Sequence, residues 1–194
     1  MSSELVKLFF DSFLETLLMV GLSGLIGAVL GIPLGVTLNI TEAHGILPYP
    51  LFDRTLGLIV NAVRSTPFII LLVAVIPFTR LVTGSSIGTA AAIVPLTIAA
   101  TPFVARLVES ALREVDAGLV EAAQAMGATP RQIILKVLLP EALPALVSAL
   151  TLSVINLIGY SAMAGAIGGG KLRVIALSTP ADSSLWTGNA EVYR

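Results

Sequence analysis

The chain has 194 residues, of which 56% are hydrophobic and only 12% are charged, with 11 Lys and Arg against 12 Asp and Glu. A soluble domain carries roughly a quarter charged residues, so this composition excludes an ordinary soluble globule. A net charge of −1 provides no basic surface for a nucleic-acid backbone. With no cysteine and one histidine, the chain offers no disulfide framework, thiolate nucleophile or zinc site, and we expect no cofactor.

The first expected element is an amphipathic helix that leads into a long apolar run. Leu5, Phe9 and Phe13 recur at helical spacing among charged residues, which is typical of a helix lying at a membrane interface. Residues 16–41 then contain no charge. Small residues recur within this run at intervals of three and four, and they predict a groove for close helix packing. These residues are Gly21, Gly24, Gly27, Gly31 and Gly35.

Three more apolar runs follow, at 55–79, 81–105 and 142–170, and the four runs together contain one charge, Arg64. As helices, runs of this length reach roughly 37 to 43 Å, more than the ~30 Å hydrocarbon core of a bilayer. The sequence therefore predicts an all-α, polytopic integral membrane bundle with four spans. Prolines predict kinks in three of these spans, at Pro33, Pro67, Pro77, Pro95 and Pro102.

The basic residues of the loops predict the orientation. Four spans place the loops 42–54 and 106–141 on one side, with Lys7 and Arg80 on the other. The positive-inside rule then puts the long loop in the cytoplasm and the N-terminus outside. The basic residues on the cytoplasmic side are Arg54, Arg106, Arg113, Arg131 and Lys136.

Two groups of polar residues are candidates for a solute pathway. Arg64 must face protein, a cavity or the headgroup region, so it either snorkels to the interface or takes part in subunit packing or gating. In the last span, Asn156, Tyr160 and Ser161 fall on neighbouring turns with Met163 nearby. This face would line a path for a small amphipathic solute, and helix packing explains it equally well.

The long loop, about 107–140, reads as helix, turn, helix. One helix is expected from about residue 103 to 114. Asp116 caps the next, 117–126, which Gly127 ends, and Thr129 and Pro130 begin a third at 131–139 that stops before Pro140. A short amphipathic helix that projects from the membrane suits a groove on a soluble partner.

This loop resembles the EAA loop of ATP-binding-cassette importer permeases, since Glu121, the pair Ala122 and Ala123, Gly127 and the terminal Leu139-Pro140 fall in register. Further runs are similar to the permeases of methionine importers. They are Arg64-Ser65-Thr66-Pro67-Phe68, Ile76-Pro77-Phe78-Thr79-Arg80, Ala125-Met126-Gly127-Ala128-Thr129-Pro130 and Gly159-Tyr160-Ser161-Ala162-Met163. The similarity covers about residues 10–170.

The resemblance implies a type I permease fold and a homodimer in the bacterial inner membrane. It also implies two copies of a separate ATPase, a methionine-binding lipoprotein, and import of D- or L-methionine by alternating access. Hydrolysis of ATP would belong to the partner, so the chain itself is expected to have no catalytic residues. The residues that would couple the chain to the ATPase are Glu121, Ala122, Ala123, Gly127, Ala128 and Pro140.

The chain departs from the family after Gly170. The family continues into a fifth span, whereas residues 171–194 contain no apolar run long enough to cross a membrane. We therefore expect a permease domain at 1–170 and a divergent tail at 171–194 that arises from a frameshift, a truncation or a wrong gene end. Two alternatives stay open: a passive channel or facilitator, and a truncated permease without function.

Overall fold

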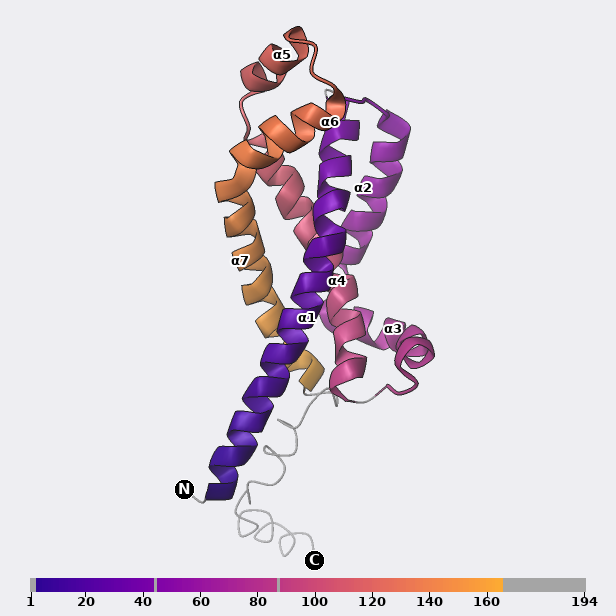
Figure 1. Ribbon diagram of the computed structural model, residues 1–194. Coiled ribbons are helices and arrows are strands. Elements are labelled where there is room, and N and C mark those ends of the chain that lie inside the picture. The colour runs from indigo at the N-terminus through magenta and orange to yellow at the C-terminus, as the bar shows by residue number, and fades with distance from the viewer. Residues whose placement is uncertain (1–2, 44, 87, 166–194) are drawn as a thin grey trace, which may run out of the picture.

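The computed structural model describes residues 3–43, 45–86 and 88–165, and every regular element within these ranges is helical (Figure 1). The predicted all-α class is confirmed. The tail at 171–194 and the end of the last expected span, 166–170, lie outside the described residues. The elements are α1 (Ser3–Thr41), α2 (Pro50–Ser65), α3 (Phe68–Thr83), α4 (Thr89–Arg113), α5 (Ala117–Ala125), α6 (Pro130–Ile133), the π-helix η1 (Ile134–Leu138) and α7 (Leu139–Ala164).

Within the described ranges, three segments are each long and apolar enough to cross a membrane: Phe9–Thr41, Thr89–Arg113 and Pro130–Ala164. The expected interfacial helix before the first span is not a separate element, because α1 runs through it as one helix of 39 residues. The N-terminal end of α1 and the short helix α5 lie at opposite ends of the molecule (Figure 1). A bilayer crossed by these helices would therefore have α5 and the start of α1 on opposite sides.

The second expected span, 55–79, is broken at Pro67, one of the prolines predicted to interrupt the spans. α2 and α3 meet at an angle of 108°. Thr66 precedes a proline and takes an extended conformation with φ −78° and ψ 127°, as the proline ring requires of its neighbour. Pro67 is also extended, with ψ 134°, so the helix cannot continue. The other four prolines lie within α1, α3 and α4 without ending them.

The close contact of α1 with α4 organises the bundle, and it confirms the predicted glycine groove. A Cβ atom on Gly27 would lie 2.7 Å from the Cβ of Ala100, and one on Gly31 would lie 2.7 Å from the Cβ of Val104. At Gly35 the added atom would lie 2.5 Å from the carbonyl oxygen of Ala105. Real side chains do not approach this closely, so only glycine lets the two backbones lie side by side.

The other two glycines of the groove behave differently. Gly24 faces Leu157 of α7 at an ordinary contact distance of 3.4 Å from a Cβ atom. Gly21 has no atom within 4 Å of the position of a Cβ. The α1 stripe therefore serves two helices, with its second half against α4 and Gly24 against α7.

A chain of ion pairs fastens α4 to α1 and α2 near the end that carries α5. Glu109 is 3% exposed and accepts hydrogen bonds from Arg106 Nη1 at 2.6 Å and Arg113 Nη2 at 2.7 Å. Arg113 also donates to both carboxylate oxygens of Glu42, just beyond α1, at 3.1 Å each. Arg106 Nη2 donates to the carbonyl oxygen of Gly57 in α2 at 3.0 Å. One buried carboxylate thus holds two cations that reach two other helices.

The glycine contact predicts that Gly31→Ala destabilises the protein, because the new methyl group must push α1 from α4. Overpacking of this kind costs about 1–3 kcal/mol. The matched change Gly21→Ala adds the same group to the same helix in open space, so it should leave stability unchanged or raise it. Thermal unfolding of the detergent-purified chain measures both, and equal melting temperatures for the two variants would contradict the role of the groove.

The ion pairs predict that Glu109→Gln destabilises the chain by about 3 kcal/mol, because the change keeps the shape of the side chain and leaves the Arg106 guanidinium without a counter-charge. Glu114→Gln removes the same charge from an exposed residue at the end of α4 and should have little effect. The comparison is made by chemical denaturation in detergent. A loss as large for Glu114→Gln would show that net charge, and not the buried pair, sets the stability.

Candidate coupling site

The candidate site is built around α5, which projects beyond the end of the bundle (Figure 1). Its start follows the predicted cap, because the Asp116 carboxylate accepts a hydrogen bond from the N–H of Gly118 at 2.7 Å. An acidic cap satisfies a free N–H and complements the positive end of the helix. α5 ends at Ala125, one residue before the predicted end.

The end of α5 explains why the motif needs its glycine. The Ala128 N–H donates to the Ala123 carbonyl at 3.0 Å, and the Gly127 N–H donates to the Gln124 carbonyl at 2.9 Å. This pair of bonds is a Schellman motif, which requires a left-handed residue just past the helix. Gly127 has φ +75°, and the space around it is open. Glycine is therefore required here for its backbone conformation and not for lack of room.

The two alanines of the motif differ in burial, because they lie on different faces of α5. Ala123 is 4% exposed and packs in a cluster with Ile133 and Leu138, with the half-buried Ala128 against it. Ala122 is exposed on the outer surface. Ala123 and Ala128 therefore hold α5 against the following helix, whereas Ala122 is available to a partner.

The outer surface of α5 also carries apolar side chains without cover in the described structure. Met126 is 82% exposed and Leu119 is 43% exposed. Exposed apolar side chains beside a small residue, on a short helix that stands clear of the bundle, form a suitable surface for a groove on another protein.

After α5 the chain returns through a capping box. Thr129 and Gln132 satisfy each other, since the Thr129 N–H donates to Gln132 Oε1 at 2.9 Å, and Pro130 occupies the first turn. The expected stop before Pro140 is wrong, because the chain continues as helix from α6 through η1 into α7. The Leu139 N–H bonds five residues back, to the Ile134 carbonyl, and this wider π-turn accommodates a proline that has no N–H to donate.

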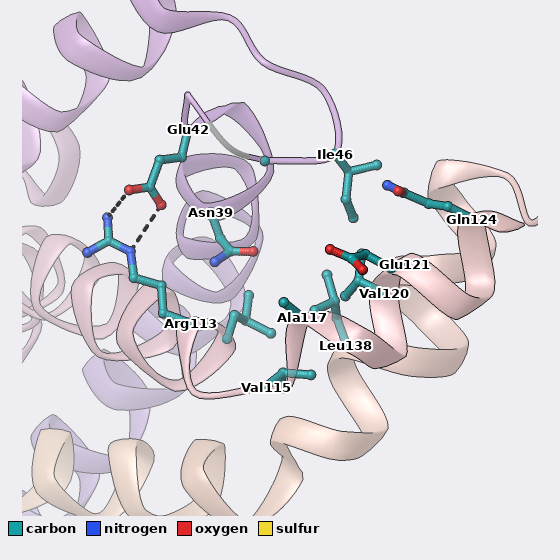
Figure 2. A pocket seen from close by; sticks show the side chains of 12 residues that line it. Asn39, Glu42, Ile46, Arg113, Val115, Ala117, Val120, Glu121, Gln124 and Leu138 are labelled. Atoms are coloured by element: carbon teal, nitrogen blue, oxygen red, sulfur yellow. Dashed lines mark hydrogen bonds and ion pairs between the residues drawn. The ribbon is translucent and has the colours of Figure 1, made fainter.

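Glu121 lines a cavity of about 400 Å³ between α5 and the ends of α1 and α4. Figure 2 shows its carboxylate turned toward Asn39 and Ile46, with the Gln124 side chain entering from the same helix. The stem of Arg113 forms part of another wall while its guanidinium is held by Glu42 (Figure 2). Glu121, the first residue of the motif, thus faces a cavity formed by this chain itself, between α5 and the ends of α1 and α4.

Sequence reasoning missed Asn39, Glu42 and Gln124 as neighbours of the motif. Gln124 lies within the loop, but Asn39 and Glu42 come from a segment about 80 residues earlier, and no local pattern relates them to it. Pro140 is exposed at the start of α7 and lines neither this cavity nor the cluster around Ala123. Pro140 instead lies in the first turn of α7, two residues after the end of η1.

The pathway candidates fall into two groups. Arg64 and Tyr160 line the same small cavity between α2, α3, α4 and α7, where the Tyr160 ring stacks on Phe68 with centroids 4.5 Å apart. Ser161 is buried and donates to the Ile158 carbonyl of its own helix at 2.8 Å. The side chain of Asn156 is half-buried and that of Met163 is 43% exposed. The structure therefore joins Arg64 to Tyr160 and leaves the other three apart from them.

The coupling loop and the pathway candidates contain no cluster of metal-ligating side chains among the described residues. Within the part of the chain that the structure describes, no three His, Asp or Glu side chains gather as a set of metal ligands. What the site offers is a short helix with a buried inner face and an exposed outer face, followed after the Gly127 turn by a helix that continues from α6 through η1 into the span α7.

Residues 27–188 match the family model described as binding-protein-dependent transport system inner membrane component. The chain is 58% identical over 163 residues to the probable D-methionine transport system permease protein MetI of Vibrio cholerae, covering 84% of this chain and 72% of that protein. It is 55% identical over 165 residues to the D-methionine transport system permease protein MetI of Escherichia coli K12, covering 85% and 76%.

Among solved structures, the chain matches one described as an inward-facing conformation of the MetNI methionine ABC transporter, in its native crystal form. The TM-score is 0.89 with 53% identity, and the match covers 93% of this chain and 84% of that chain. The helical order, the EAA-type loop and these matches agree, and this chain belongs to the family of binding-protein-dependent transport system inner membrane components.

Proposed function

We propose that this chain is the membrane-spanning subunit of an ATP-driven importer of methionine, in its D or L form. The observation that carries the proposal is the geometry of α5, a short helix with a buried inner face and an exposed outer face beyond the end of the bundle. Identity above 50% with permeases named for D-methionine transport gives the substrate. ATP would be hydrolysed by a partner, in two copies, beneath a homodimer of this chain.

In this mechanism α5 transmits movement from the ATPase to the spans. Closure of two ATPase subunits would draw their grooves and the seated α5 helices together. Because α6, η1 and α7 form continuous helix, a displacement of the loop reaches α7 directly. The ion pairs of Glu109 carry the same movement from α4 to α1 and α2. The permease halves would then alternate between inward and outward openings and pass methionine delivered by its binding lipoprotein.

The coupling residues have separate roles in this proposal. Ala122 and the exposed tip of α5 contact the ATPase, while Ala123, Gly127 and Ala128 fix the shape of the loop. Glu121 provides a carboxylate at the cavity beneath α5. Pro140 sets the π-turn that joins the loop to the last described span. A passive channel would have no use for such a helix, so the coupled importer accounts for more of the structure.

We further propose that the loop bearing α5 lies in the cytoplasm and the N-terminus lies outside, in a bacterial inner membrane. Support comes from the excess of basic residues in the loops 42–54 and 106–141. The placement of α5 and the start of α1 at opposite ends of the molecule is consistent with this orientation (Figure 1). For the pathway, the candidates remain Arg64, Asn156, Tyr160, Ser161 and Met163.

The coupling role predicts that Gly127→Asp lowers ATP-dependent methionine uptake at least about tenfold, because it places a negative charge at the negative end of α5, on the surface that meets the partner. Gly127→Asn has the same size and also tolerates the left-handed conformation, so it should retain more of the uptake. Both variants should insert in the membrane normally. Uptake by the Asp variant equal to that of the Asn variant would contradict a docking role for this turn.

The orientation predicts opposite labelling of two single-cysteine variants. The chain contains no cysteine, so Ser85→Cys, between α3 and α4, and Met126→Cys, directly after α5, can each be labelled without removing native thiols. A membrane-impermeant maleimide added to intact spheroplasts should label the first variant and reach the second only after permeabilisation. The reverse pattern would overturn the proposed orientation while leaving the family assignment intact.

A further inference from the structure

The one charge in the four apolar runs, Arg64, forms no ion pair with any acidic side chain among the described residues. Arg64 lies in the last turn of α2, ten residues after Arg54, and is an exposed side chain. Ten residues of helix rise about 15 Å, which is half of a ~30 Å hydrocarbon core. Every ion pair within the described part of the chain involves an arginine of α4, and none includes Arg64.

An aromatic ring holds this cation in place. The Arg64 guanidinium carbon lies 5.9 Å from the centroid of the Phe103 ring in α4. A cation–π contact of this kind favours one position of the side chain but leaves the charge uncompensated. A cation at membrane depth is costly unless an anion or water accompanies it, and such residues mark solute paths. The guanidinium of Arg64 is therefore positioned by Phe103, and it has no carboxylate partner among the described residues.

Apart from Thr66, the walls around Arg64 are apolar and aromatic. Phe68 of α3 stacks on Tyr160 of α7, with the ring planes at 5° to each other, and both rings line the same cavity as Arg64 and Phe103. One cation among aromatic and aliphatic walls is complementary to an amino acid with a free carboxylate and an apolar side chain. A thioether suits such walls well, because sulfur is polarisable and contacts aromatic rings favourably.

This cavity is too small for an amino acid in the present structure. Its volume is about 10 Å³, which is room for one water molecule at most. The Phe68 and Tyr160 rings come from different helices, and Phe68 directly follows the break between α2 and α3. Separation of α3 from α7 at this stack is therefore the movement that would admit a larger molecule.

We propose that Arg64 binds the carboxylate of the transported amino acid, and that the stack of Phe68 on Tyr160 closes this site. The inference rests on the proposed import function and adds to it a residue that recognises the solute inside the membrane. Arg64 acts as a binding residue for the solute, while Phe103 positions it. The requirement for a carboxylate would then be read in the permease as well as in the binding protein.

The test uses the full complex of permease, ATPase and binding protein in proteoliposomes, with radiolabelled methionine as the probe. Methionine uptake and ATP hydrolysis are measured in the same vesicles. In Arg64→Gln the amount of methionine moved per ATP should fall about 10- to 100-fold, the usual loss when a charge-assisted hydrogen bond is removed. Hydrolysis stimulated by the binding protein should persist, because α5 and the ATPase are untouched.

Two matched variants accompany it. Arg64→Lys keeps the cation and loses the planar fork, so it should restore part of the methionine moved per ATP. Arg80→Gln removes an arginine near the end of α3, away from the cavity, and should transport as the wild type does.

Three outcomes would overturn the inference. Unchanged transport by Arg64→Gln would do so directly. Parallel loss of uptake, hydrolysis and assembly would assign Arg64 to packing or to a lipid phosphate. Equal transport by the Gln and Lys variants would show that charge at this position is irrelevant. A wild-type complex that hydrolyses ATP and moves no methionine would instead overturn the proposed function, and the inference with it.

Discussion

The close approach of α1 to α4 is the constraint on which the rest of the structure depends. Three glycines at intervals of four residues remove every side-chain atom from one stripe of α1, and α4 fills that stripe with Ala100, Val104 and Val108. Once these two helices are fixed, α4 presents its other faces to α2, α3 and α7. The loop begins where α4 ends, so the position of α5 is also set by this contact.

The ion pairs extend the same arrangement by other means. Van der Waals packing of glycine against valine defines the distance between α1 and α4, but it does little to stop the two helices from sliding along each other. Glu109 and its two arginines resist sliding, because their hydrogen bonds are directional and the other partners of the arginines lie just beyond α1, at Glu42, and in α2, at Gly57. Packing and charge therefore restrain different movements of one joint, and both converge at the end of the bundle nearest to α5.

The sequence was sufficient for the features that depend on local chemistry. Asp116 as a cap, Gly127 as a helix end and Thr129 with Pro130 as a helix start all follow from single residues and their neighbours, and the structure confirms each of them. The glycine groove was equally predictable, because its glycines recur at intervals of three and four residues within the single segment α1. Pro67 and Pro140 were harder, since both are prolines in apolar helices and yet one breaks its helix and the other does not.

The difference between those prolines is physical. Thr66 and Pro67 both take extended conformations, whereas the chain before Pro140 adds one residue to the turn and remains helical. Which solution a proline adopts depends on the helices packed around it, and a single sequence does not contain them. The cavity beside Glu121 was hidden for a related reason, since Asn39 and Glu42 reach it only through the α1–α4 contact. Proximity between distant segments is the information that local patterns lack.

The π-turn at η1 has a consequence for how this family could diversify. Buried residues of α7 recur every three or four positions, from Ala142 through Leu146 to Ala149, but Ile133, just before η1, and Leu138, the last residue of η1, are five apart. One surplus residue in a helix rotates everything beyond it by about 100°. The direction in which the loop buries its side chains is therefore independent of the direction in which the span buries its own. A protein built in this way could change the partner that its loop fits while its membrane core stays as it is.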